Sequence, residues 1–225
     1  MLIPINQTLS PFNNKIFQQS ISDWWTIDLI SPLVAYQPYG ATSYANSLIN
    51  LANPGTFDAG QFLTYNEPDW SALNGWEFNG NAILDSGLNF NLYEPYSFIL
   101  KYSNLSVPSV QAQIIAVNDG TTNGQYVFTS SSEFRIRKST NLYQHGSFVY
   151  SGVVGTNDDD VVVNGSITEN VVSFTTFPNT TLKIGSGYYT SLQYPSTCYI
   201  QAFAAYNETL TGSQMQTLTT RLQGL

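Results

Sequence analysis

Several residue types are scarce in this chain of 225 residues, and each scarcity excludes a class of protein. One cysteine rules out an intramolecular disulfide, and one histidine rules out a histidine-rich metal site. That cysteine, Cys198, lies in the apolar run CYIQAFAAY, which predicts a buried and unreactive thiol. No window approaches the ~18 uninterrupted apolar residues of a membrane span. The N-terminus also lacks the apolar segment of a secretion signal.

Charge is scarce too, at 10% of residues against roughly 25% in average soluble domains. The net charge of −8 argues against nucleic-acid binding, since phosphate contacts need clustered Lys and Arg. Three basic residues do cluster, in Arg135-Ile136-Arg137-Lys138, but alternation with apolar residues favours the solvated face of a strand over a polyanion patch. A surface of Asn, Ser, Thr, Gln and Tyr is typical of secreted, cell-surface or virion proteins.

Short apolar–polar alternation is abundant, and it predicts an all-β fold of one domain. Turn sequences such as Asn-Gly separate the alternating runs, as in a sandwich or barrel. The predicted strands are Leu33–Tyr36, Gly75–Asn79, Ala82–Asp85, Tyr96–Tyr102, Ala112–Val117, Gln125–Thr129, Glu133–Lys138, Gly146–Tyr150, Val161–Val163, Thr181–Ile184 and Cys198–Tyr206.

The stretch GWEFNGNAILDSG predicts one strand and a turn. Trp76 and Phe78 fall on one face of an extended chain, which indicates a buried face. Asn79-Gly80 tolerates positive φ and predicts a tight hairpin that returns Ile83 and Leu84 as the next strand. In YSFILKY, the same alternation places Tyr96, Phe98, Leu100 and Tyr102 inward and turns Ser97 and Lys101 outward.

The two ends of the chain differ from the middle. Thr211 and Gln214 form a capping box, and Leu210 can pack on Met215, so a short amphipathic helix should close the chain and pack on the sandwich. Residues 1–28 are rich in Asn and Gln and contain the pair Trp24-Trp25. They predict an N-terminal arm that docks into the domain at its end, as an assembly contact or as an edge strand.

Seven segments in order carry a family resemblance. They are LVAYQPYG, SLINLANPGTFDAG, PDWSALNGWEFNGNAILDSGL, YSFILKYSN, DDDVVVNGS, TLKIGSG and CYIQAFAAYNETLTGSQMQTLTTRL. This order resembles the concanavalin A-like, laminin-G-like jelly-roll domains of phage and bacterial surface proteins, over roughly residues 31–225. The resemblance implies an antiparallel jelly-roll sandwich with GWEFNGNAILDSG as a core hairpin. With the arm over 1–28, the jelly-roll domain is predicted over 29–225.

Members of the fold that the chain resembles include glycoside hydrolases, so catalytic carboxylates are the first groups to look for. The glucanase pattern E-x-D-x-x-E has its nearest match at Glu67-Pro68-Asp69, where Ala72 replaces the third carboxylate and Pro68 predicts a loop. His145 is predicted at a loop tip between strands, and no nucleophile elbow or phosphate loop is present. The chain is therefore predicted not to be an enzyme and to have no catalytic residues.

Binding is the remaining chemistry. Aromatic planes stack on the apolar faces of sugar rings, and amides read the hydroxyls. The candidate glycan-binding residues are Trp70, Tyr143, Tyr188, Tyr189 and Tyr194, with filling of a sandwich edge or subunit interface as the alternative. Asp158 and Asp160 are the candidate Ca²⁺ ligands, with a solvated turn as the alternative, because consecutive Asp residues cannot all face one ion. No other cofactor is predicted.

Three functions follow, in order of preference. The first is a non-enzymatic structural and adhesive protein of a virion or similar surface assembly. It would join other subunits through its N-terminal arm, form a homo-oligomer, lie on a virion or extracellular surface and recognise a host glycan. The second is a free lectin-like carbohydrate-binding protein. The third is a glycoside hydrolase with an unrecognised site. Neither nucleic acid nor a membrane span is expected.

Overall fold

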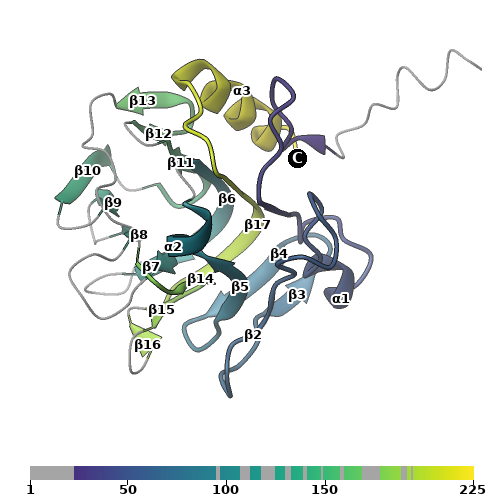
Figure 1. Cartoon of the computed structure of the whole chain (residues 1–225). Coiled ribbons are helices and arrows are strands. Elements are labelled where there is room, and N and C mark those ends of the chain that lie inside the picture. The colour runs from purple at the N-terminus through teal and green to yellow at the C-terminus, as the bar shows by residue number, and fades with distance from the viewer. Residues whose placement is uncertain are drawn as a thin grey trace, which may run out of the picture.

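The computed structural model describes residues 23–94, 97–106, 112–117, 125–129, 133–138, 141–147, 149–157, 160–168, 178–188, 192–193 and 195–225. Within 125–147, and at residues 188, 192 and 193, it describes the backbone alone. Two antiparallel sheets form a sandwich, and a helix near the C-terminus lies against one of them (Figure 1). The predicted all-β sandwich with a C-terminal helix is thus confirmed.

One sheet has eight strands and is organised around the last strand of the chain. Its strands in spatial order are β13 (Ser166–Thr168), β12 (Val161–Val163), β11 (Gly152–Thr156), β6 (Ser97–Ser106), β17 (Thr197–Tyr206), β4 (Gly75–Asn79) and β3 (Asp69–Ser71), and β1 (Val34–Tyr36) also pairs with β17. On β17, Ile200 lies opposite Tyr102 on one side and Trp76 on the other. Strand β17 therefore joins early, middle and late parts of the chain.

The second sheet has seven strands. In spatial order they are β10 (Asn141–Ser147), β9 (Glu133–Lys138), β8 (Gln125–Thr129), β7 (Ala112–Val117), β14 (Thr181–Ile184), β5 (Leu84–Asn89) and β2 (Gly60–Gln61). A separate two-stranded ribbon consists of β15 (Gly187–Tyr188) and β16 (Leu192–Gln193). The helices are α1 (Tyr44–Ser47), α2 (Phe90–Tyr93) and α3 (Gly212–Gln223).

The inner core lies between the two sheets. Trp76 and Phe78 of β4 are completely buried there, together with Leu84 of β5 and Phe203 of β17. The indole N–H of Trp76 donates to the hydroxyl of Ser47 at 2.8 Å, which satisfies its one polar atom. The prediction that these two aromatics are packing residues is confirmed.

A second apolar cluster covers the outer face of the eight-stranded sheet. Met215, Leu218 and Leu222 of α3 are completely buried in it, with residues of the underlying strands such as Ile99 and Ala204. The predicted capping box of α3 is present, since the Thr211 side chain accepts from the Gln214 backbone and the Gln214 side chain accepts from the Thr211 backbone. The predicted closing helix is therefore confirmed in position and in capping.

The first described residues join this outer cluster. Trp24 and Trp25 are buried, with their rings in an edge-to-face arrangement 5.8 Å apart. The Arg221 guanidinium of α3 donates to the backbone carbonyls of Trp24, at 3.3 Å, and Thr26. Figure 1 shows this purple segment beside α3 and the C-terminus. The other residues of the predicted arm, 1–22, lie outside the described part of the chain.

The predicted β4–β5 hairpin is wrong. Strand β4 belongs to the eight-stranded sheet and β5 to the seven-stranded sheet, so the turn at Asn79-Gly80 carries the chain across the sandwich. Gly80 does adopt the expected positive φ, of +85°. The turn conformation was predictable, but the long-range partners of each strand decide which sheet it joins.

Ser97 faces outward from the inner core as predicted, but it is not exposed to solvent. Ser97 is completely buried, because α3 and the segment before it cover the outer face of β6. Its hydroxyl donates to the carbonyl of Glu208 at 2.8 Å and accepts from the N–H of Leu210 at 2.9 Å. Ser97 thus ties strand β6 to the start of the closing helix.

Some predicted boundaries also need correction. His145 was expected at a loop tip but lies in β10, opposite Phe134 of β9. The strand predicted over Gly146–Tyr150 is wrong, because β10 ends at Ser147 after a register shift that follows His145. Strand β5 is longer and later than predicted, and β2, β3, β11, β13, β15 and β16 were not predicted. No helix among the described residues is long and apolar enough to cross a membrane.

Candidate functional site

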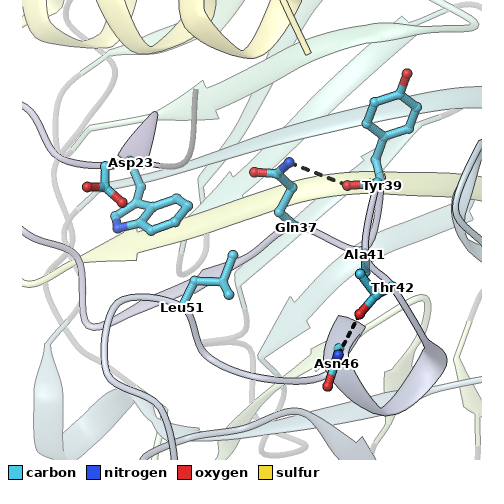
Figure 2. Close-up of a pocket in the computed structure, with 9 residues that line it drawn as sticks. Asp23, Gln37, Tyr39, Ala41, Thr42, Asn46 and Leu51 are labelled. Atoms are coloured by element: carbon cyan, nitrogen blue, oxygen red, sulfur yellow. Dashed lines mark hydrogen bonds between the residues drawn. The ribbon is translucent and has the colours of Figure 1, made fainter. Parts of the chain in front are cut away.

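An open pocket of about 470 Å³ lies beside the outer cluster of the eight-stranded sheet. Its lining comes from the first described segment, the chain that follows β1, helix α1 and the loop after it. The lining residues are Asp23, Trp25, Gln37, Tyr39, Gly40, Ala41, Thr42, Asn46 and Leu51. In Figure 2, Asp23 and Leu51 lie on one side, Tyr39, Thr42 and Asn46 on the other, and Gln37 between them. The volume is within the range of about 300–1,000 Å³ typical of small-ligand sites.

The segment that carries Trp25, one of the two aromatic residues in the lining, is held by the closing helix α3 and the last strand β17. The hydroxyl of Tyr206, which is completely buried, donates to the backbone carbonyl of Trp25 at 2.7 Å. Gln214 of α3 donates to the carboxylate of Asp28 at 3.0 Å, and Arg221 binds the carbonyls of Trp24 and Thr26. These contacts fix a short segment that would otherwise have few backbone partners.

Gln37 lies between the two sides of the pocket (Figure 2). Side chains alternate along β1, so Gln37 lies on the same outer face as Ala35. Its side-chain carbonyl accepts from the indole N–H of Trp24 at 3.1 Å, and its amide N–H donates to the backbone carbonyl of Tyr39 at 3.4 Å. Gln37 therefore connects the aromatic segment to the loop that carries Tyr39.

The opposite wall is formed by the loop after β1 and by α1. The amide N–H of Asn46 donates to the Thr42 hydroxyl at 2.6 Å, as Figure 2 shows. Ser43 caps α1, since its hydroxyl accepts from the Asn46 backbone N–H at 3.1 Å. Both Thr42 and Asn46 are exposed, so a ligand in the pocket can reach their polar atoms.

The charge of the pocket is negative. Asp23 is exposed and is the one carboxylate among the lining residues, none of which is Lys, Arg or His. The ammonium of Lys101 lies 5.9 Å from the ring centroid of Tyr39, within the range of a cation–π contact. Burial lowers the pKa of Lys101 from its ordinary value. Most glycosidases use two carboxylates about 5–9.5 Å apart, and the lining supplies only one.

Chemically, this arrangement suits recognition of a polar, ring-shaped ligand. Trp25 and Tyr39 provide aromatic surface, and Gln37 and Asn46 provide amides that donate and accept. Thr42 adds a hydroxyl, and Asp23 adds an acceptor that binds neighbouring hydroxyl groups. These are the groups that bind a sugar, whose C–H faces stack and whose hydroxyls hydrogen-bond.

Trp70 is the predicted binding residue that the structure describes most fully. It lies on β3, half-buried against the inner core, and its indole N–H donates to the carbonyl of Pro38 at 2.9 Å. Trp70 thus supports the backbone next to Tyr39 and does not line the pocket.

The other predicted binding residues are described less fully. Tyr143 lies in β10 and Tyr188 in β15, but their side chains are outside the described part of the structure, as are Tyr189 and Tyr194 entirely.

Of the two predicted calcium ligands, the structure describes Asp160, whereas Asp158 lies outside the described residues. Asp160 accepts from the side-chain amide of Asn157 at 3.0 Å, and its backbone N–H donates to the Asn157 side chain at 2.5 Å. Asn157 also donates to the carbonyl of Leu210. Among the described residues, no cluster of three or more His, Cys, Asp or Glu is placed to hold a metal ion. The calcium site stays a prediction.

The pocket residues were not predicted from the sequence, although one signal was present. Tyr39 follows the predicted strand Leu33–Tyr36 in Gln-Pro-Tyr-Gly, an aromatic in a turn next to an amide. The same pattern of an aromatic beside amides singled out the other tyrosines. Asp23 and Trp25 carried no such signal, because only the folded chain brings them to Tyr39.

Comparisons with known proteins identify the fold. No protein-family model and no curated protein matches the chain. Trypanosoma rangeli sialidase in complex with sialic acid is similar over 94% of this chain and 38% of that one, with 13% identity and a TM-score of 0.60. The NanB sialidase of Streptococcus pneumoniae is similar over 63% of this chain and 27% of that one, with 13% identity and a TM-score of 0.50.

A third structure is the CBM40 of the Ruminococcus gnavus IT-sialidase bound to α2,3-sialyllactose. It has 13% identity over 55% of this chain and 80% of that one, with a TM-score of 0.48. Likeness at such low identity establishes fold and leaves function to the site itself. The chain therefore has a jelly-roll, concanavalin A-like sandwich of the kind that also occurs within sialidases.

Proposed function

We propose that this protein binds carbohydrate in the pocket between Asp23, Tyr39 and Asn46, and that its role is non-catalytic. The observation that carries the proposal is the composition of the pocket: two aromatics, two amides, a hydroxyl and one carboxylate line about 470 Å³ of open space. The free lectin-like protein, the second of the functions predicted from the sequence, is therefore the better supported function. A place at an extracellular surface belongs to the same proposal.

The positions of these groups support binding over turnover. The carboxylate of Asp23 has no second carboxylate across the pocket to act as its acid or nucleophile partner. Outside the pocket, Asp69 of β3 and Glu77 of β4 are cross-strand partners, and both are exposed. A pair on an exposed strand surface has no enclosing site to position a sugar or to exclude water.

The test is a glycan-binding measurement with matched variants. The native chain and Tyr39→Ala are applied to a glycan array, and the glycans that bind are titrated by calorimetry. Loss of the ring should weaken binding about tenfold or more, which corresponds to ~1.4 kcal/mol. Tyr150→Ala is the control, since Tyr150 is exposed and does not line the pocket. If no glycan binds the native chain, or if both variants bind equally well, the pocket is not a carbohydrate site.

Membership of a virion or other surface assembly, through residues 1–28, stays a prediction. Residues 23–28 of that arm pack on the sandwich and supply Asp23 and Trp25 to the pocket. An assembly role and a glycan-binding role are compatible, because the described end of the arm serves the pocket.

A further inference from the structure

Resting on the proposed function, we infer that the pocket selects uncharged sugars and rejects sugars that carry a carboxylate, sialic acid among them. A fold does not determine the ligand of a site, so the charge of the lining decides which sugars this pocket can take.

The lining of the pocket supplies no positive charge. Of its nine residues, Asp23 alone carries a full charge at neutral pH, and that charge is negative. A bound carboxylate is ordinarily met by Arg or Lys, most effectively by the two parallel N–H groups of a guanidinium. In this pocket a sugar carboxylate would instead meet the carboxylate of Asp23, within a chain of net charge −8.

Two cations lie near the pocket, and both already have structural contacts. The Arg221 guanidinium donates to the carbonyls of Trp24 and Thr26, which hold the segment carrying Trp25. The Lys101 ammonium lies over the ring of Tyr39. Neither Arg221 nor Lys101 lines the pocket. Redirecting either cation to a ligand would give up a contact that shapes the pocket wall.

The same groups are well suited to a neutral sugar. Each carboxylate oxygen of Asp23 can accept from a sugar hydroxyl, and an ionised acceptor makes stronger hydrogen bonds than a neutral one. Asn46 and Gln37 offer amides to the remaining hydroxyls, and Tyr39 offers an aromatic surface. Asp23 therefore contributes to specificity in two ways, by accepting from hydroxyls and by repelling anions.

The experiment compares glycans that differ only in sialic acid. Array spots are printed in pairs, each neutral core beside its sialylated form, with lactose and α2,3-sialyllactose as the soluble pair for titration. We expect the neutral member to bind at least tenfold more tightly than the sialylated one. In Asp23→Asn this ratio should shrink at least threefold, because the repulsion is removed. In Asp69→Asn it should not change, since Asp69 is exposed on β3 and does not line the pocket.

The outcomes separate this inference from the proposed function. Equal or tighter binding of the sialylated member overturns the inference and leaves carbohydrate binding standing. Preference for the neutral member that survives unchanged in Asp23→Asn overturns the role given to Asp23. Absence of binding to either member of every pair overturns both the inference and the proposed function. Circular dichroism on each variant excludes misfolding as the cause of any loss.

Discussion

Cys198 shows how strongly burial controls chemistry at a single residue. Its thiol is buried in β17 and lies 3.5 Å from the hydroxyl of Ser196. Burial raises the pKa of Cys198 from 9.0 to about 12, and the Ser196 hydroxyl offsets this only in part. The predicted inert thiol is consistent with this environment, because the thiolate is the reactive form.

This shift predicts alkaline destabilisation. A folded pKa above the unfolded value gives stability that is complete below pH 9 and is lost as the pH rises toward 12. Cys198 should thus remove about 1.4 kcal/mol of unfolding free energy between pH 8 and 10. Urea unfolding of the native chain and Cys198→Ala over this range measures it. Parallel pH curves for the two proteins would contradict the assignment, since the buried tyrosines titrate in both.

Gly80 and Gly185 allow the cost of a strained backbone to be compared with the cost of a steric clash. Gly80 and Gly185 have similar positive φ, of +85° and +92°. A Cβ at Gly80 would have Thr197 as its nearest neighbour, at 3.5 Å, whereas at Gly185 it would lie 2.0 Å from the ring of Phe78. Gly80→Ala should therefore cost roughly 1–2 kcal/mol from φ alone. Gly185→Ala should cost about 1–3 kcal/mol more, from overpacking.

Chemical denaturation of the two alanine variants provides the comparison. Equal losses of unfolding free energy at the two positions would mean that Phe78 moves aside freely. That result would contradict the tight packing expected of a side chain completely buried between the sheets.

At the residue scale, the sequence predicted Trp76, Phe78 and Cys198 correctly because large apolar side chains in alternating runs have one stable location. It could not predict Ser97, whose burial depends on a helix more than one hundred residues later.

At the scale of elements, α3 depends on its cap. Thr211 accepts from the backbone of Gln214, so Thr211→Ala should lower the unfolding free energy by about 1 kcal/mol. Thr217→Ala is the control, because Thr217 is exposed within the helix and alanine is a good helix former. Thermal unfolding should show a lower midpoint for Thr211→Ala and a change within ±0.5 kcal/mol for Thr217→Ala. The opposite ranking would show that the capping box does not stabilise α3.

Local patterns predicted most elements but not their partners. The capping box and the strands β4, β7, β8, β9, β12 and β14 have the predicted bounds, because each rests on nearby residues. The β4–β5 turn was misread as a hairpin, since Asn-Gly supplies positive φ equally well to a hairpin and to a crossing between sheets. Strands β2, β3 and β13 have two or three residues with at most one large apolar side chain, whereas the equally short β12 is a run of three valines.

At the scale of the whole molecule, the N-terminal arm can be tested without damaging the sandwich. A chain that begins at Asp23 keeps the buried Trp24, Trp25 and Ile27, whereas one that begins at Ile30 loses them. Each such side chain stabilises the fold by about 1.5–3 kcal/mol. If residues 1–22 mediate assembly, the full chain should be a defined oligomer and the chain from Asp23 a monomer with unchanged thermal stability.

Light scattering coupled to size-exclusion chromatography gives the answer. A monomeric full chain would end the assembly hypothesis and leave the glycan-binding proposal untouched. The chain from Ile30 should be less stable and should lose the pocket, since Asp23 and Trp25 are absent from it.

The fold class was predictable from the chain as a whole, whereas the candidate site was not. Many short alternating strands with turn residues between them have few stable arrangements, and the jelly roll is one of these. The pocket depends on three segments that only the folded chain brings together: Asp23 and Trp25, the Tyr39 loop, and Asn46. Tyr206 and Arg221, from the far end of the chain, hold the first of these segments. No local pattern records that meeting.

The central position of β17 has a consequence for how the protein folds. Its partners β1, β4 and β6 are all made long before it, and Ser97 meets Glu208 across 111 positions of sequence. Contacts between such distant positions carry a large loop-closure entropy, so folding should take milliseconds to seconds. During synthesis, the edges of β1, β4 and β6 that pair with β17 would stay unpaired until β17 leaves the ribosome. This protein should therefore depend on chaperones that bind exposed strand edges mainly while it is being synthesised.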